Sequence, residues 1–178
     1  MGSQFKKVVF KTGNGHDPGY LRVNRWQRTI WLVWLEEPMN NIQVRFAKLQ
    51  DLPFVSQDGF IPPEVVIRKI EVQEVVLAEI EGQPVGYLRL EYLWSLVPYI
   101  ALVTVEPPHR RIGVGQAMLA FVNQFLADAD HEWLYSSSQA DEPEPQAWHR
   151  HMGFQDCGII TGINAGGVSE VFFKKAVC

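Results

Sequence analysis

Beyond residue 41, apolar and polar residues alternate in short runs, the two-residue period that is typical of β-strands. In IQVRFAKL (42–49), Ile42, Val44 and Phe46 would share one face of a strand. Two β-rich runs, 74–80 and 85–93, flank the sequence EGQP and predict a hairpin. Further strands are predicted at 98–105, 132–138, 154–160 and 168–175.

Between two of these strands the period changes to that of a helix. Val114, Met118, Phe121, Val122 and Phe125 recur at helical spacing, so a helix starting near residue 114 should lay a broad apolar face on a sheet. Three shorter helices are also predicted. Asp51 can cap the first, Pro62 and Pro63 suit the start of the second, and the third lies between Pro145 and Gly153. Hairpins plus one strand–helix–strand crossover predict an α/β fold in which helices and a mixed sheet form a sandwich.

Residues 1–40 follow a different pattern. Their three tryptophans, Trp26, Trp31 and Trp34, do not fall on one face of a helix or a strand. We expect an extension that packs on the domain as an added strand or hairpin, because apolar surface is usually buried. A subunit contact in a homodimer and a contact with a membrane surface remain open alternatives. The predicted organisation is therefore an extension, 1–40, and one domain, 41–178.

Composition narrows the class of protein. The 178 residues are 47% hydrophobic and 20% charged with a net charge of −4, which is typical of a globular domain and argues against general nucleic-acid binding. No apolar run reaches the length of a membrane span, and the N-terminus lacks a signal-peptide pattern. Two cysteines without a CxxC pair favour a cytoplasmic location and no metal site.

The stretch VEPPHRRIGVGQAML (105–119) carries the most specific chemistry. Pro107 ends a strand, and two glycines let the backbone approach a ligand closely before the helix begins. The first amides of a helix lack partners, and two arginines add positive charge, so the turn is suited to a pyrophosphate. A plain connecting turn is the alternative. A dinucleotide fingerprint fails because Met118 stands where its third glycine belongs.

These residues resemble a known family. Val105, Pro107, Arg110, Gly113 and Gly115 match V-x-P-x-x-R-x-x-G-x-G, which is similar to the acyl-CoA-binding motif of the GNAT superfamily of N-acyltransferases. WHRHMGF (148–154) is similar to the later short helix of that family, which ends in Gly-Phe. The resemblance covers roughly residues 42–175 by element order and implies a mostly antiparallel central sheet with helices on both faces.

The resemblance implies acetyl-CoA as the acyl donor and no metal. Its pyrophosphate would lie on the amides of the motif turn beside Arg110, namely those of Arg111, Ile112, Gly113, Val114, Gly115 and Gln116. The pantetheine arm would pair with the preceding strand at Val103, Thr104 and Val105, where the family splays two strands apart. A strand amide would then polarise the acetyl carbonyl.

The resemblance is less complete at the catalytic residues. Where relatives often have a tyrosine that protonates the departing thiolate, this chain has His149, whose imidazole ordinarily titrates near neutral pH. Tyr99 stands where some relatives have a general-base glutamate, and Glu91 on the neighbouring strand could act through a water. We expect an N-acetyltransferase that acts by direct attack of a small-molecule or peptide amine. The alternative is a non-catalytic acyl-CoA-binding module.

Overall fold

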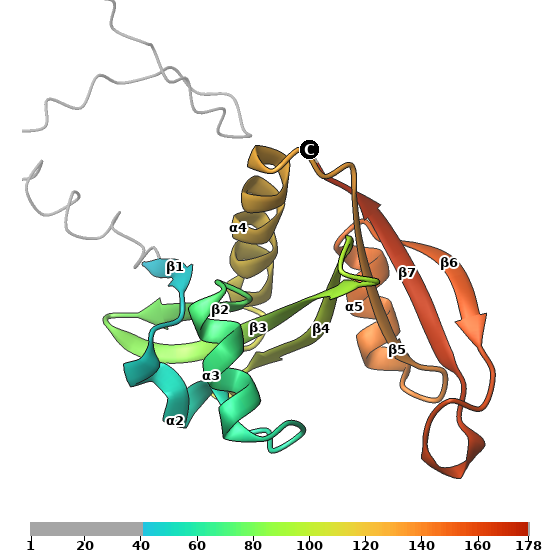
Figure 1. Ribbon diagram of the computed structural model, residues 1–178, viewed down its shortest axis with the longest axis horizontal. Coiled ribbons are helices and arrows are strands. Elements are labelled where there is room, and N and C mark those ends of the chain that lie inside the picture. Colours follow the sequence, from blue (N-terminus) through green and yellow to red (C-terminus); the bar gives the residue numbers. More distant parts are fainter. Residues whose placement is uncertain (1–40, 178) are drawn as a thin grey trace, which may run out of the picture. The chain divides into compact units, whose positions relative to one another are not determined.

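The computed structural model describes residues 41–177, which form a seven-stranded sheet in the order β1-β2-β3-β4-β5-β7-β6 (Figure 1). The strands are β1 (Ile42–Phe46), β2 (Val75–Ile80), β3 (Gln83–Leu93), β4 (Val97–Val105), β5 (Trp133–Gln139), β6 (Gln155–Ile160) and β7 (Glu170–Ala176). The helices are α2 (Leu52–Val55), α3 (Pro63–Glu71), α4 (Val114–Asp128) and α5 (Pro143–His151). All pairs are antiparallel except β4 with β5, which confirms the mixed, mostly antiparallel sheet.

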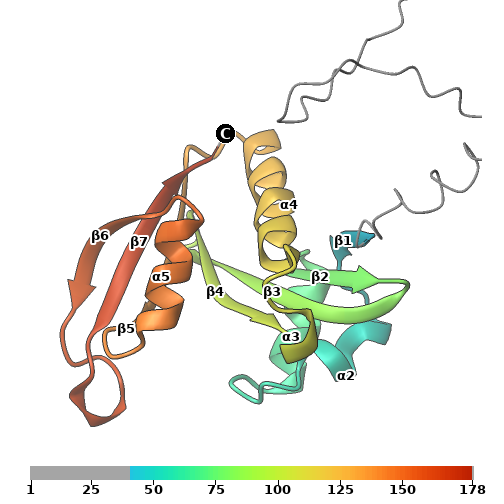
Figure 2. The ribbon, with the colours of Figure 1, turned by 180° about the vertical axis from the view of Figure 1, so that it is seen from behind.

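Helices cover both faces of this sheet. The helices α4 and α5 lie on one face, where α4 packs on β1 to β4 and α5 packs on β5 and β6 (Figure 2). The apolar stripe of α4 is buried there against Leu88, Leu90 and Ile100. On the other face, α2 and α3 cover Tyr87 and Leu77. The helices α3 and α4 therefore each bury an apolar face against the sheet.

The sheet is nearly divided at its centre. Only two residue pairs join β4 to β5, Tyr99 with Tyr135 and Ile100 with Ser136, and beyond them the strands diverge into a wedge (Figure 1). A bulge accompanies the divergence, because Arg89 pairs with Leu102 while Leu90 pairs with Ile100, which leaves Ala101 unmatched. A bulge bends its strand and locally disrupts its ladder. We call the two joined pairs the apex of the wedge.

Two local details differ from the expectations. Asp51 does stand at the N-cap of α2, but its carboxylate binds the Arg45 guanidinium and the Lys48 amide instead of capping that helix. Glu81 and Gly82 alone form the β2–β3 turn, since β3 already begins at Gln83. The predicted extension, residues 1–40, lies outside the described residues, so its packing stays a prediction. Among residues 41–177, no helix is both long and apolar enough to cross a bilayer.

Candidate active site

The turn between β4 and α4 presents a row of unpaired backbone amides. The first backbone bond of α4 is donated by Ala117 to the carbonyl of Gly113, so the preceding amides lie ahead of the helical ladder. Within residues 41–177, no hydrogen bond uses a backbone N–H from Arg111 to Gln116. These amides stand at the positive end of the helix dipole, which is the arrangement that binds phosphate groups.

The backbone of this turn adopts conformations that glycine tolerates best. Gly113, the N-cap of α4, has φ of 95°, in the left-handed region where a Cβ is disfavoured. Arg111 also has a positive φ, 64°, although it carries a side chain. A non-glycine residue in this region costs roughly 1–2 kcal/mol, and such strain tends to occur at ligand-binding sites.

Gly115 has a different role. A Cβ at this position would lie 3.4 Å from Nε1 of Trp148, so the glycine lets the indole of α5 approach the first turn of α4. From the sequence, Gly115 is expected to let the backbone approach the pyrophosphate closely. The structure adds a second reason for the glycine, because Trp148 packs directly on it.

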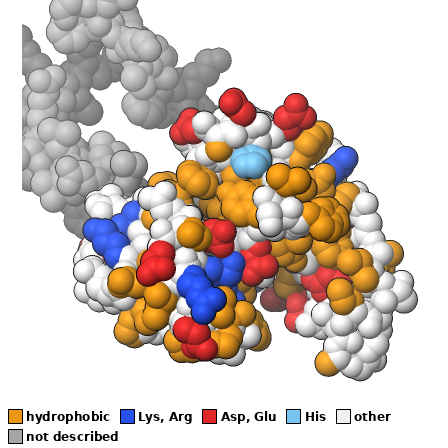
Figure 3. All heavy atoms as spheres, in the orientation of Figure 1, with side chains coloured by type: hydrophobic (Ala, Val, Ile, Leu, Met, Phe, Trp, Pro, Cys, Tyr) orange, Lys and Arg blue, Asp and Glu red, His pale blue; other side chains and the backbone are white. Residues whose placement is uncertain are grey.

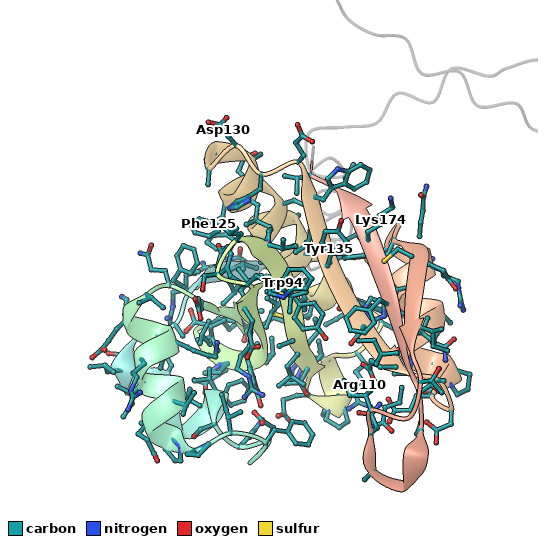
Figure 4. The ribbon with its side chains drawn as sticks, turned by 45° about the vertical axis from the view of Figure 1, so that its right-hand side comes forward. Trp94, Arg110, Phe125, Asp130, Tyr135 and Lys174 are labelled. Atoms are coloured by element: carbon teal, nitrogen blue, oxygen red, sulfur yellow. The ribbon has the colours of Figure 1, made fainter. Side chains whose placement is uncertain are left out.

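The two arginines of the turn differ in whether they are bonded. Arg110 is exposed and donates from Nε to the carbonyl of Val105, which fixes the end of β4 beside the turn. Arg111 is exposed and makes no bond within the described residues, so its charge is available to an anion. Figure 4 shows Arg110 near the end of β4 that opens into the wedge.

The edge of β4 that faces the wedge has no strand beside it. Val103, Thr104 and Val105 pair with β3 on one side, and the β4–β5 ladder ends at Ile100 on the other. An edge of this kind offers unpaired amides and carbonyls to an extended ligand. The predicted pantetheine site and the amide row are therefore continuous along β4 and its following turn.

His149 lies on the α4–α5 side of the apex and is almost completely buried, with 5% of its surface exposed. Its ring stacks on Phe173 with centroids 4.6 Å apart. Burial lowers the pKa of His149 below its ordinary value of 6.5, although the bond to Pro145 opposes the shift. The sequence alone predicts an imidazole with its ordinary pKa near neutrality, whereas the lowered pKa of this buried ring favours its neutral form at neutral pH.

Both ring nitrogens of His149 lie within hydrogen-bond distance of a polar atom. Its Nδ1 lies 2.7 Å from the carbonyl of Pro145, and its Nε2 lies 2.8 Å from Oγ of Ser136, which is 3.1 Å from the carbonyl of Ile100. Both terminal groups are carbonyls and can only accept. A neutral imidazole and a hydroxyl carry two protons for these three contacts. Because the Pro145 carbonyl can only accept and lies 2.7 Å away, we assign the ring proton to Nδ1, which leaves the Ser136 proton to be shared between Nε2 and the Ile100 carbonyl.

Tyr99 lies on the opposite face of the sheet, where a second chain of hydrogen bonds spans the apex. Its hydroxyl is 2.6 Å from Oγ of Ser137, and Ser137 donates to the carboxylate of Glu170. Asn164 donates to the other oxygen of that carboxylate at 2.7 Å. Burial is the main cause that raises the pKa of Tyr99, and the charges of Glu170 and Glu91 add to it, so the phenol stays protonated.

Glu91 lies directly opposite Tyr99 in the β3–β4 ladder. Its carboxylate is 3.4 Å from Nζ of Lys69, and both side chains line a groove beside α3. The remaining lining residues are Val65, Glu74, Tyr92 and Ser95. Charged atoms gather around the hollow between the α3 side and the β5–β7 side, bordered by apolar side chains (Figure 3). The structure thus brings Glu91 and Tyr99 together on one face and leaves His149 on the other.

Most residues of this candidate site lie within a region that resembles a known protein family. Residues 71–156, which include the amide row, the wedge and all of α5, match the family profile described as the acetyltransferase (GNAT) domain. Residues 71–156 are therefore similar to a GNAT acetyltransferase domain. A search of curated proteins found no significant match to the chain.

Solved structures share the fold of this chain at low sequence identity. Ard1 from Thermoplasma volcanium is 14% identical with a TM-score of 0.68, covering 77% of this chain and 98% of its own. The ribosomal-protein-alanine N-acetyltransferase from Brucella melitensis is 22% identical with a TM-score of 0.65, covering 75% and 99%. YncA from Salmonella typhimurium, solved with its cofactor acetyl-CoA, is 14% identical with a TM-score of 0.67, covering 78% and 95%. These similarities establish the fold.

Some polar residues near the apex were not predicted from sequence. Ser136, Ser137, Glu170 and Asn164 all bond at the apex or next to it, yet none belongs to the two motifs. The serine run in YSSSQ was a usable signal, because strand alternation sends Ser136 and Ser137 to opposite faces. Among residues 41–177, no group of three His, Cys, Asp or Glu side chains could hold a metal ion.

Proposed function

We propose that the chain is an N-acetyltransferase that transfers the acetyl group of acetyl-CoA to an amine by direct attack. The observation that carries this proposal is the row of unpaired amides from Arg111 to Gln116, placed where β4 leaves the wedge. Pyrophosphate on this row, with Arg110 and Arg111 beside it, would direct the pantetheine arm along Val103 to Val105. The thioester would then reach the apex.

The acceptor would approach from the face that carries Tyr99, Glu91 and the α3 groove. Tyr99 and Glu91 are partly exposed on this face, and Glu91 lines the groove beside α3. A small-molecule amine and a peptide amine both fit the proposal, and neither a nucleic acid nor a membrane is part of it. We also propose a cytoplasmic location, which is supported by the cysteine content of the sequence alone.

His149 would act through Ser136 on the leaving thiolate. Attack converts the amine nitrogen to an ammonium in the tetrahedral intermediate, and its excess proton must reach the thiolate as the C–S bond breaks. A neutral His149 can accept the Ser136 proton at Nε2 while the hydroxyl takes up the proton of the intermediate. The reverse transfer then delivers a proton to sulfur. Tyr99 and Glu91 are the corresponding candidates for deprotonation on the acceptor face.

The experiment that tests this function is a screen of amine panels for CoA release. Turnover with at least one amine, and the matching acetylated product by mass spectrometry, is the expected result. Binding of acetyl-CoA without turnover of any amine would favour the non-catalytic acyl-CoA-binding module instead. The absence of saturable acetyl-CoA binding would contradict both readings.

The variant Gly113→Val tests the amide row in the same assay. A β-branched side chain at this positive φ would distort the turn, so we expect a loss of CoA affinity of at least about 100-fold, which corresponds to several lost charge-assisted contacts. Gly82→Val in the β2–β3 turn is the matched control, because Gly82 also has a positive φ but lies elsewhere. Calorimetry should find CoA affinity close to that of the parent for this control.

A further inference from the structure

Glu170, the first residue of β7, is a half-buried carboxylate with neutral partners only. Ser137 bonds to one of its oxygens and Asn164 to the other. Among residues 41–177, no Lys, Arg or His side chain pairs with it within 4.0 Å. Lys174, the cation on the same face of β7, lies instead over the ring of Trp133, at the end of the strand far from the β6–β7 loop (Figure 4). The negative charge of Glu170 is therefore uncompensated.

The Glu170 carboxylate can accept further hydrogen bonds besides those from Ser137 and Asn164. An ionised carboxylate can only accept, so Ser137 must donate its proton to Glu170 and accept from the Tyr99 hydroxyl. Each carboxylate oxygen has two acceptor positions, and the structure fills one on each. Two acceptor positions stay free for a ligand that brings N–H donors.

The position of Glu170 relates it to the apex of the wedge. Glu170 pairs with Gln139 on β5, and Ser137 is the diagonal neighbour of that pair on the same face. Ser137 bonds in turn to Tyr99, which belongs to the last joined pairs of β4 and β5. The charge of Glu170 acts on both Tyr99 and His149, which is consistent with a carboxylate beside the apex. It thus lies one hydroxyl away from the point that the thioester would reach.

Aromatic rings complete the surroundings. Phe172 follows on the same face of β7, and its ring centroid is 6.2 Å from that of Tyr99. The side chains of Tyr99, Glu170 and Phe172 are only partly buried, so a solute can approach them. A carboxylate beside aromatic rings favours an organic cation, because both the charge and the ring faces attract it.

We infer that Glu170 binds the cationic nitrogen of the acceptor and so makes this domain selective for amines that arrive as ammonium ions. The inference rests on the proposed function, since it names a recognition group for the substrate of that site. Ser137 and Asn164 are positioning residues, because they orient the carboxylate without contacting the acceptor. The remaining positions of the carboxylate would take two N–H donors of the ammonium ion.

The test uses the full chain, loaded with CoA, and a defined probe. n-Butylammonium chloride is titrated at constant ionic strength while amide signals of Ser137 and Glu170 are followed by NMR, and n-butanol serves as the uncharged probe. The parent should bind the ammonium ion and not the alcohol. Glu170→Gln should weaken that binding roughly 10- to 100-fold, the range for a lost charge-assisted hydrogen bond.

Two controls separate recognition from structure. Asn164→Ala removes the contact with the β6–β7 loop but keeps the charge, so it should retain most of the binding. Glu144→Gln removes an exposed carboxylate of α5 and should change nothing. Equal affinity of Glu170→Gln and the parent, an equally large loss in Asn164→Ala, or no saturable binding of n-butylammonium to the parent would each overturn the inference.

The kinetic readout distinguishes this inference from the proposed function. With any amine that the parent acetylates, Glu170→Gln should raise KM for the amine roughly 10- to 100-fold and leave acetyl-CoA affinity unchanged. An unchanged KM for such an amine would overturn the role of Glu170 while the acetyltransferase stands. If no amine is acetylated, the proposed function fails and the n-butylammonium titration alone decides whether Glu170 binds a cation.

Discussion

The two faces of the apex are built from neighbouring serines but differ in almost every physical property. On the α4–α5 face, Ser136 is 2% exposed and bonds to a buried neutral imidazole and a backbone carbonyl. On the other face, Ser137 is partly exposed and bonds to a phenol and a carboxylate. We call these the closed face and the open face. Strand alternation alone sends the two hydroxyls in opposite directions.

The contrast separates two tasks. On the closed face, burial fixes the position of each group. Two protons serve three hydrogen-bond contacts there, so the Ser136 proton can move between two acceptors. On the open face, water and solutes can reach an uncompensated charge. A reaction between a bound thioester and an incoming amine needs both a fixed proton path and an accessible charge. The proposed roles of His149 and Glu170 follow this division.

The largest expected effect concerns turnover on the closed face. His149→Ala should lower the turnover rate about 10²- to 10⁴-fold, the usual span for a positioned proton-transfer group, and leave CoA affinity nearly unchanged. His149→Tyr should restore part of the rate, since a phenol can also donate a proton. Initial rates at saturating acetyl-CoA, with chemistry shown to be rate-limiting, measure the effect.

His151 supplies the matched control on the same helix, because it is exposed while His149 is buried. His151→Ala should turn over acetyl-CoA like the parent. If His149→Ala also keeps the parent rate, the closed face has no part in proton transfer. The thiolate would then leave with the help of water or of Tyr99.

The next effect compares the two serines as stabilising groups. Ser136→Ala leaves the Ile100 carbonyl and Nε2 of His149 without a partner in a buried site, so the free energy of unfolding should fall by about 1–3 kcal/mol. Ser137→Ala exposes its partners to water, so its loss should stay below about 1 kcal/mol. Urea denaturation of both variants measures the difference. Equal losses would show that the two faces do not differ in effective burial.

The smallest effect is a pH dependence of stability. The pKa of His149 is lowered in the folded chain, so below about pH 6.5 the unfolded chain binds more protons and the free energy of unfolding decreases. The decrease should continue until the pH reaches the lowered pKa, with a slope of at most about 1.4 kcal/mol per pH unit. His149→Gln should flatten this slope, whereas His151→Gln should keep it. A slope that is unchanged in His149→Gln would mean that another group titrates.

Much of the fold was predictable because its signals are local. The apolar stripe from Val114 to Phe125 gave α4, and the EGQP sequence between two β-rich runs gave the β2–β3 hairpin. The amide row was equally local, since Gly113, Gly115 and the start of a helix lie within a few residues of one another. Each of these features depends on backbone preferences that neighbouring residues set.

The open face was not predictable for the opposite reason. Glu170 reaches the apex only because β7 pairs with β5 in the register that places Glu170 opposite Gln139. That register brings together residues more than thirty positions apart, and no local pattern encodes it. The burial of His149 could not be predicted from the sequence either. A short helix such as α5 can turn either of two faces inward, and here the face toward Phe173 is the buried one.

The short ladder at the apex has a mechanical consequence. Two residue pairs are all that hold β4 to β5, so the antiparallel block β1–β4 and the block β5-β7-β6 are connected across the sheet by few backbone hydrogen bonds. A change in the angle between the two blocks breaks little of the ladder, whereas bending within either block would disrupt many bonds. The sheet is therefore stiff within each half and compliant at the joint, and that compliance is located where the donor and the acceptor would meet.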